Sequence, residues 1–231
     1  FDNSTDLANY PQTQTEDICY LSDAKIDYLF IPKRDEILTN LDDNFQLPWG
    51  FSNLLCGKFR KNHFNGVFAI VKRLFEIIHP NYVFFGEKDY QQSLLIKYII
   101  ENYYRSTELI VCPTMRNSDK LALSSRNSLI AKSPLTKISK LIDGLKKTCI
   151  NYHSATGLKD FKKFYLRSDF CKTQYIEMFR EDVLHEKHGV RDIGNIKKNN
   201  SRIFISVYYK NIRLIDNQSV EEYDNVWRDH S

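Results

Sequence analysis

The first half of the chain alternates between short apolar runs and longer stretches with helical spacing. The runs Ile26–Ile31, Tyr82–Phe85 and Leu109–Cys112 are typical of buried strands, and the first and third are each followed by proline. Residues 66–79 and 90–104 carry apolar side chains three or four positions apart, which predicts two helices. Strands separated by helices of this length predict a parallel sheet with right-handed crossovers, and therefore an α/β fold.

The second half of the chain has a different pattern. Ser133 and Pro134 are residue types that favour the N-cap and first position of a helix, which we expect to run to about Ile150. The run Ile203–Tyr209 predicts a strand, and Ile212–Ile215 its antiparallel partner. Shorter elements are expected at residues 127–131, 161–165 and 173–179.

This change of pattern predicts a domain boundary near Pro113. Residues 1–113 would form the parallel α/β domain, and residues 114–231 a smaller α+β domain. The polar tail after Asn217 is expected to be loose, and Arg202 is expected in a solvated turn before a strand.

Composition narrows the class of protein. The 231 residues are 42% hydrophobic and 27% charged, as in a globular chain, and no apolar run approaches the length of a membrane span. The net charge is only +4 and the lysines and arginines are dispersed, which argues against a nucleic-acid partner. The five cysteines form no CxxC pair, which fits free thiols in a reducing compartment and predicts a cytoplasmic protein. Neither a Walker A sequence nor GxGxxG is present.

The most informative segment is FFGEKDYQQ, where the second strand ends and a helix begins. Ligands of open α/β sheets bind at the carboxyl ends of strands, and helix N-termini favour anions. Gly86 would let the backbone approach a ligand, Lys88 would bind phosphate, Asp89 would accept from a ribose hydroxyl, and Gln92 would face the same crevice. Alternatively, Glu87 and Asp89 simply favour the start of a surface helix.

A second candidate is the segment LALSSRN. Its serines Ser124 and Ser125 and the planar cation of Arg126 could clamp a polyphosphate, although either serine could instead be an ordinary N-cap. In a third segment, GKFRKNHFNGV, Arg60 and His63 could reach a carboxylate or phosphate.

Metal-binding patterns are weak throughout. Glu16 and Asp17 could hold a divalent ion but are more typical of a solvated helix start. His185 and His188 have no thiol at zinc spacing, so no metal site is assigned.

Six segments in this order resemble the pantoate–β-alanine ligase (pantothenate synthetase) family of the HxGH-type nucleotidylyl transferase superfamily. The resemblance covers nearly the whole chain and is thin between Ser128 and Asp169. The segments are FDNSTDLANYP, GKFRKNHFNGV, FGEKDYQQ, CPTMR, LALSSRN and RLIDN, at residues 1–11, 57–67, 85–92, 112–116, 121–127 and 213–217.

The resemblance implies a Rossmann-like nucleotide-binding domain followed by a lid domain, and an ATP-dependent ligase. Pantoate would attack ATP, which carries Mg2+, to give pantoyl adenylate and pyrophosphate. β-Alanine would then displace AMP to give pantothenate. The family also suggests a homodimer.

The resemblance also implies roles for individual residues. Lys88, Ser124 and Arg126 would be catalytic, and Gln92, Phe85 and Arg60 would contact the pantoate substrate. The ATP site would comprise Gly86, Glu87, Lys88, Asp89, Met115, Leu123, Ser124, Ser125 and Arg126.

The sequence departs from the family pattern in three places. The family's first strand and its HxGH helix start are not in these residues, so the Rossmann-like domain is expected to be incomplete at its N-terminus and the 231 residues alone to be inactive. Cys56 stands where a glutamate is usual, and Lys61 where a proline is usual. The alternative function is a non-catalytic nucleotide-binding domain of the same superfamily.

Overall fold

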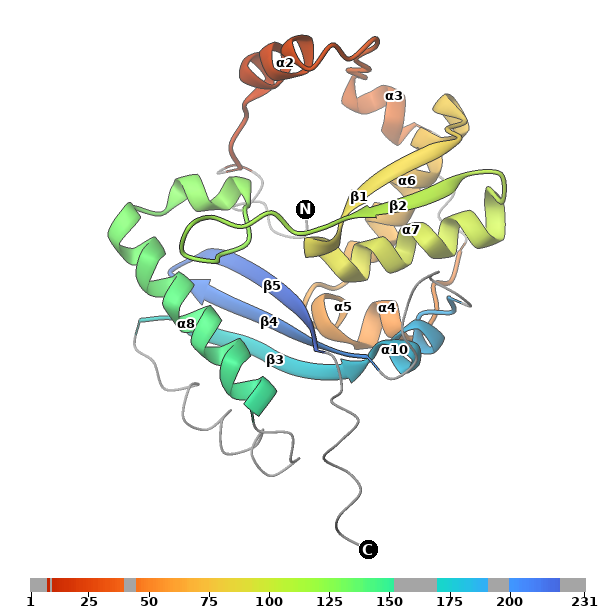
Figure 1. Cartoon of the computed structure of the whole chain (residues 1–231). Helices are drawn as coiled ribbons and strands as arrows, with labels where there is room; N and C mark the ends of the chain where they lie inside the picture. The colour runs from red at the N-terminus through yellow and green to blue at the C-terminus, as the bar shows by residue number, and fades with distance from the viewer. Residues whose placement is uncertain (1–7, 9, 40–44, 152–169, 191–199, 221–231) are drawn as a thin grey trace, which may run out of the picture.

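The computed structural model describes residues 8, 10–39, 45–151, 170–190 and 200–220. In its first half, β1 (Tyr82–Gly86) and β2 (Glu108–Cys112) pair in parallel, with Val83 opposite Leu109. Helices α6 (His63–Ile78) and α7 (Tyr90–Tyr103) pack on each other, and α7 contacts both strands (Figure 1). The predicted pair of parallel strands with its helices is confirmed.

The spacing of aromatic residues explains why α6 forms and which face it buries. Phe64, Phe68, Val71 and Phe75 lie three or four positions apart, so all four point to one side and are buried. The helix ends at Ile78, and the next residue, His79, caps it with a left-handed backbone (φ 49°) before a proline.

The second half is an antiparallel sheet of β3 (Lys172–Arg180), β4 (Ser201–Tyr209) and β5 (Ile212–Val220), in that order. The long helix α8 (Lys132–Asn151) lies against β4 and β5 (Figure 1). A tight turn at Lys210 joins β4 to β5, with the left-handed backbone that such hairpins need.

The central strand β4 is buried on both faces. Ile203, Ile205 and Val207 pack in the same cluster as Ile138 and Ile142 of α8. Phe204, on the opposite face, belongs to the core of the first half. One strand therefore contributes to both cores, which explains why its sequence reads as a continuous apolar run rather than an alternating one.

Short elements connect and surround these two layers. Helices α4 (Gly50–Asn53) and α5 (Leu55–Phe59) approach so closely that a Cβ on Gly57 would collide with the Phe51 carbonyl group, so only glycine fits there. The short elements are α2 (Gln14–Asp23), α3 (Arg34–Leu38), α4 (Gly50–Asn53), α5 (Leu55–Phe59), η1 (Glu87–Asp89), η2 (Ser125–Leu129) and α10 (Glu181–Lys187).

The prediction that Ile26–Ile31 forms a buried strand is wrong. The segment has no strand conformation, and its Tyr28 is 92% exposed. An apolar run becomes a strand only when a neighbour supplies hydrogen bonds, and none of the described strands pairs with this segment.

Three smaller predictions also need correction. Helix α8 begins at Lys132, so Ser133 is not its N-cap and Pro134 lies within the first turn, where its missing N–H costs no hydrogen bond. Strand β5 continues past Asn217 to Val220, so the tail is not loose from Asn217 onward. Residues 161–165 lie outside the described part.

A buried histidine joins the two halves near α10. His188 Nδ1 donates to the Leu184 carbonyl at 2.6 Å, so its Nε2 is left to accept from the Gln91 amide at 3.0 Å. The same amide nitrogen donates to the Gly50 and Leu54 carbonyls. Burial lowers the pKa of His188 to about 4, and the hydrogen bond to Leu184 opposes this only in part.

This lowered pKa predicts a loss of stability on mild acidification. The unfolded chain binds a proton at His188 near pH 6.5 and the folded chain only near pH 4, so the free energy of unfolding falls as the pH drops through this window. The loss should approach about 3 kcal/mol. Urea titrations between pH 7.5 and pH 4 should show it in the parent and a flatter dependence in His188→Gln; parallel curves would contradict it.

Candidate functional site

Two adjoining hollows lie where β1 ends, between the two halves of the molecule. We call the first the basic hollow, because its charged lining comprises Arg60, Lys88, Asp89, Arg126 and Arg213. We call the second the aromatic hollow; Gln92 lines it together with Phe64, Tyr90, Tyr175 and Phe204. Arg60, Lys88 and Asp89 line both hollows, so the two form one continuous site.

The basic hollow has a strong excess of positive charge. Four of its charged side chains are cationic, and the one carboxylate, Asp89, lies 3.6 Å from the Lys88 ammonium. Arg213 is held in place by Gln174 Oε1, which accepts from its Nε at 2.9 Å. Cations converging on one concave surface favour a polyanionic ligand such as a polyphosphate.

The aromatic hollow combines aromatic and aliphatic side chains with a larger number of polar and charged ones. The Tyr175 hydroxyl lies 3.2 Å from the Cys56 sulfur, and burial raises the pKa of Tyr175, so this hydroxyl stays protonated. The amide of Gln92 can both donate and accept. An apolar wall beside hydrogen-bonding groups fits a small branched ligand that bears hydroxyl groups.

The structure brings together most of the side chains that the sequence singled out. Lys88, Asp89 and Arg60 line both hollows, Ser124 and Arg126 the basic one, and Gln92 the aromatic one. Gly86 has an ordinary backbone (φ −76°), and no atom lies within 4 Å of an added Cβ, so the space beside it is open to a ligand.

Other predicted residues lie elsewhere. The Glu87 carboxylate turns to Arg202, which donates to it at 2.8 Å. Phe85 is half-buried against the core of the first half, and Met115 is 71% exposed, with its carbonyl accepting from the Leu123 amide. The hydroxyl of Ser125 donates to Tyr10, and Leu123 is 50% exposed.

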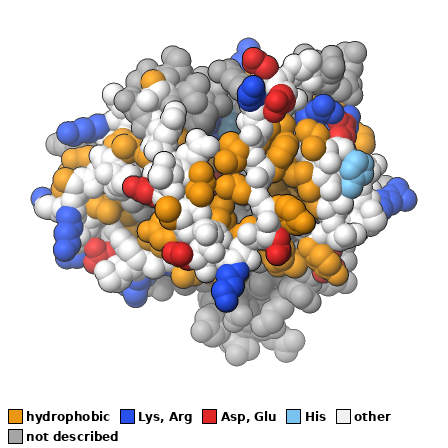
Figure 2. All heavy atoms as spheres, turned by 90° about the horizontal axis from the view of Figure 1, so that it is seen from above, with side chains coloured by type: hydrophobic (Ala, Val, Ile, Leu, Met, Phe, Trp, Pro, Cys, Tyr) orange, Lys and Arg blue, Asp and Glu red, His pale blue; other side chains and the backbone are white. Residues whose placement is uncertain are grey.

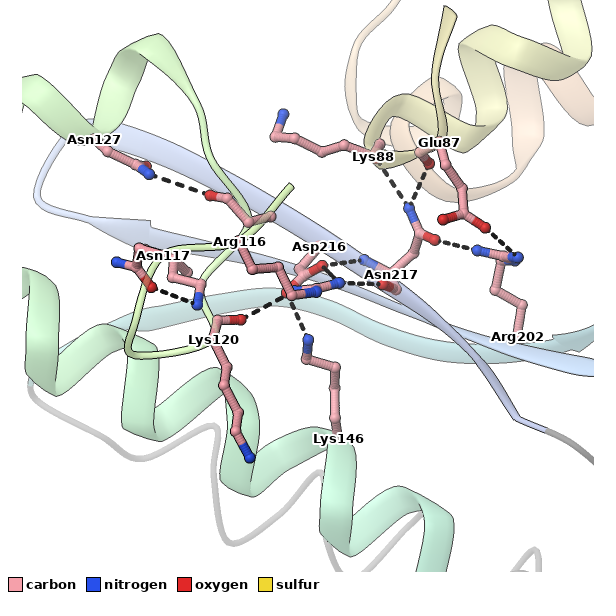
Figure 3. A network of polar contacts seen from close by, with 12 residues as sticks. Glu87, Lys88, Arg116, Asn117, Lys120, Asn127, Lys146, Arg202, Asp216 and Asn217 are labelled. Carbon is pink, nitrogen blue, oxygen red and sulfur yellow. Dashed lines mark hydrogen bonds and ion pairs between the residues drawn. The ribbon is translucent and has the colours of Figure 1, made fainter. Parts of the chain in front are cut away.

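A polar network ties β5 to the loop after β2, to α8 and to η1 (Figure 3), and its Asp216 and Asn217 also line the aromatic hollow. Asp216 has no exposed side-chain surface; Arg116 donates to both of its oxygens at 2.7 and 2.9 Å, and Lys146 of α8 donates at 2.7 Å. Burial lowers the pKa of Lys146, and the neighbouring Asp216 carboxylate opposes this shift. The next residue, Asn217, reaches the turn that carries Lys88.

The sequence alone assigns no individual role to several of these residues. The prediction that Arg202 lies in a solvated turn is wrong, because only 6% of the residue is exposed and it lies within β4. Arg213 and Asn217 were recognised only as part of RLIDN. The local signal that could have marked them is the presence of charged and amide residues on strands whose other residues are buried.

Two classes of feature are not found in the described part of the chain. No group of three or more His, Cys, Asp or Glu residues there could hold a metal ion, and His185 and His188 are both buried structural groups. None of the described helices is both long and apolar enough to cross a membrane. On the face seen in Figure 2, lysine and arginine side chains are scattered rather than gathered into a patch.

This arrangement defines a class: an α/β protein with a cation-lined hollow, suited to a polyphosphate, beside a second hollow at a strand end. Residues 1–219 match the family described as pantoate-beta-alanine ligase, and the chain belongs to that family.

Individual relatives agree with this assignment. The chain is 31% identical over 222 residues to the pantothenate synthetase of Francisella tularensis subsp. mediasiatica, covering 94% of this chain and 74% of the relative. It is 33% identical over 240 residues to that of Buchnera aphidicola subsp. Schizaphis graminum, covering 95% and 77%.

Solved structures share the fold. The pantoate-beta-alanine ligase of Francisella tularensis complexed with beta-gamma ATP and beta-alanine gives a TM-score of 0.71 at 29% identity, over 94% of this chain and 74% of the other. The pantothenate synthetase of Thermus thermophilus gives 0.75 at 26% identity, over 91% and 75%.

Two aspartates each pair with a lysine of α8, and we expect them to contribute very differently to the free energy of unfolding. Asp216→Ala leaves Arg116 and Lys146 without their shared anion and should lower the free energy of unfolding by about 3–5 kcal/mol. Asp143→Ala removes a pair with Lys147, whose side chain is 62% exposed, and should cost less than about 1 kcal/mol. Denaturant unfolding of both variants tests this, and equal losses would contradict it.

Proposed function

We propose that the protein condenses pantoate with β-alanine to form pantothenate, using ATP. The observation that carries this proposal is the shared lining of the two hollows by Lys88 and Asp89, in a chain of the pantoate-beta-alanine ligase family. A polyphosphate in the basic hollow and a small hydroxy acid in the aromatic hollow would meet at these two residues.

The reaction has two steps. A pantoate carboxylate oxygen attacks the α-phosphorus of ATP, the bond to the β-phosphate oxygen breaks, and pyrophosphate leaves. The uncharged amine of β-alanine then attacks the acyl carbon of the adenylate, AMP leaves, and the nitrogen loses a proton as the amide forms. Both steps depend mainly on positioning the reactants and stabilising negative charge.

The side chains of the basic hollow suit the first step. Lys88 and Arg126 would neutralise charge on the phosphates, and the Ser124 hydroxyl would donate to them. Asp89, at the carboxyl end of β1, would accept from a ribose hydroxyl. Gly86, Glu87, Met115, Leu123 and Ser125 would complete the ATP site through their backbone or surface.

The aromatic hollow suits pantoate. Gln92 would hydrogen-bond a hydroxyl group of the acid, Arg60 would face its carboxylate, and Phe85 would support the apolar wall from the core side. Residues 1–113 would then form the nucleotide-binding domain and 114–231 the lid domain.

The divalent cation would arrive with the nucleotide. Mg2+ usually keeps several waters and is held largely by the substrate phosphates themselves. When bound, Mg2+ would supply charge neutralisation at the phosphates. The proposal also includes a cytoplasmic location, a homodimeric state and the absence of a nucleic-acid partner.

A coupled assay tests the function directly. The full product of the gene should form pantothenate and release pyrophosphate only when ATP, pantoate and β-alanine are all present. Binding of ATP without product, in a folded protein, would instead favour the non-catalytic alternative.

Lys88 should be needed for chemistry but not for folding. Its side chain is 18% exposed and points into the hollow, so Lys88→Ala should lose about 2–4 kcal/mol of transition-state stabilisation while the melting temperature stays nearly constant. Pyrophosphate release and a melting curve, measured side by side, test both parts. A rate within a few-fold of the parent would remove Lys88 from the phosphate role.

Gln92 should affect pantoate more than ATP. Gln92→Glu keeps the shape of the side chain but adds a negative charge that repels the pantoate carboxylate, so the KM for pantoate should rise at least tenfold. The KM for ATP should change little, because Gln92 lines the aromatic hollow and not the basic one. An unchanged KM for pantoate would leave Gln92 as a residue of the helix surface.

A further inference from the structure

We infer that Asn217 is a positioning residue: it holds the η1 turn so that Lys88 and Asp89 point into the basic hollow. The inference rests on the proposed function, since it assigns a positioning role in the same site to Asn217, a residue in the lining of the aromatic hollow. Asn217 comes from β5, 129 positions further along the chain than Lys88.

The contact is made with the backbone of the turn. Asn217 Nδ2 donates to the carbonyl oxygens of Glu87 and Lys88, both at 2.9 Å. The Lys88 side chain extends from the opposite side of this turn, away from Asn217 (Figure 3). One amide group therefore fixes the backbone from behind while the ammonium group is free to reach the hollow.

Arg202 sets the orientation of that amide. Its Nη1 donates to Asn217 Oδ1 at 2.5 Å, which turns the NH2 group toward η1. Arg202 is itself held by Glu181, at 2.6 Å, and its guanidinium lies 4.2 Å from the centre of the Tyr90 ring. With 3% of Asn217 exposed, water cannot readily replace these hydrogen bonds.

Arg202 also contacts the η1 turn directly, through the side chain of Glu87. Arg202 Nη2 donates to the Glu87 carboxylate at 2.8 Å. The η1 turn spans only three residues, so contacts from outside the turn contribute strongly to its geometry. Misplacing a catalytic group by about 1 Å can cost on the order of a hundredfold in rate, so holding the turn matters for chemistry as well as for stability.

The matched variants are Asn217→Ala and Thr107→Val. Each substitution removes a side-chain hydrogen-bond donor from a buried residue. The donor of Thr107 is its Oγ1, which bonds the Pro80 carbonyl oxygen at the opposite end of β1 from the turn. Amide hydrogen exchange reports local opening of the turn and needs no enzymatic activity. Exchange in the peptide that covers residues 87–90 should quicken at least tenfold in Asn217→Ala and remain at the parent rate in Thr107→Val.

Kinetics tests whether the effect passes through Lys88. In the parent background, Asn217→Ala should lower kcat/KM for ATP in adenylate formation by ten- to a hundredfold, with the KM for β-alanine unchanged. In the Lys88→Ala background the same change should cost less than threefold, because the group that Asn217 positions is gone.

Each outcome decides the matter. Unchanged hydrogen exchange at residues 87–90 in Asn217→Ala would overturn the inference. So would a loss of kcat/KM caused by Asn217→Ala that is as large in the Lys88→Ala background as in the parent. A parent that forms no adenylate would reject the proposed function, and the exchange measurement would then decide alone whether Asn217 holds the turn.

Discussion

The burial of one carboxylate constrains much of the structure. Asp216 has no contact with solvent, so its charge must be balanced within the protein, and the balancing groups come from two separate elements. Arg116 follows β2, and Lys146 lies in α8. Neither can move far without leaving an unpaired charge in the interior, so the loop after β2, the long helix and the hairpin keep their relative positions.

This constraint also places the site. The hollows lie between the end of β1 and the β4–β5 hairpin, and only the fixed position of the hairpin brings Arg213 opposite Lys88. The parallel strands supply a carboxyl end and a turn, as α/β folds generally do, while the antiparallel sheet supplies the opposite wall. Neither half alone has the excess of positive charge that a polyphosphate requires.

Local patterns in the sequence were enough to predict the parallel strands, their helices and the β4–β5 pair, because each depends on residues close together in the chain. The run Ile26–Ile31 was mispredicted because hydrophobicity indicates a preference for burial but does not supply a strand to pair with. Arg202 was mispredicted for the opposite reason: a charged residue suggests solvent, and its partners Glu87 and Glu181 are found only in the folded structure. Motif resemblance pointed to Lys88 and Gln92. The contacts of Asn217 join residues far apart in the sequence, so only the folded structure shows them.

The connections across the site also bear on how the protein folds. Arg116 and Asp216 are 100 residues apart in sequence, and Glu87 and Arg202 are 115 apart. Contacts of such high order form late, after the helices and the local hairpin, because chain closure costs entropy before any of them is gained. A nucleotide bound across both halves, as proposed, would recognise only the finished structure, and at a hundred times its dissociation constant it would add about 2.7 kcal/mol to the free energy of unfolding. Loss of nucleotide would then remove part of the protein's resistance to unfolding and proteolysis together with its substrate.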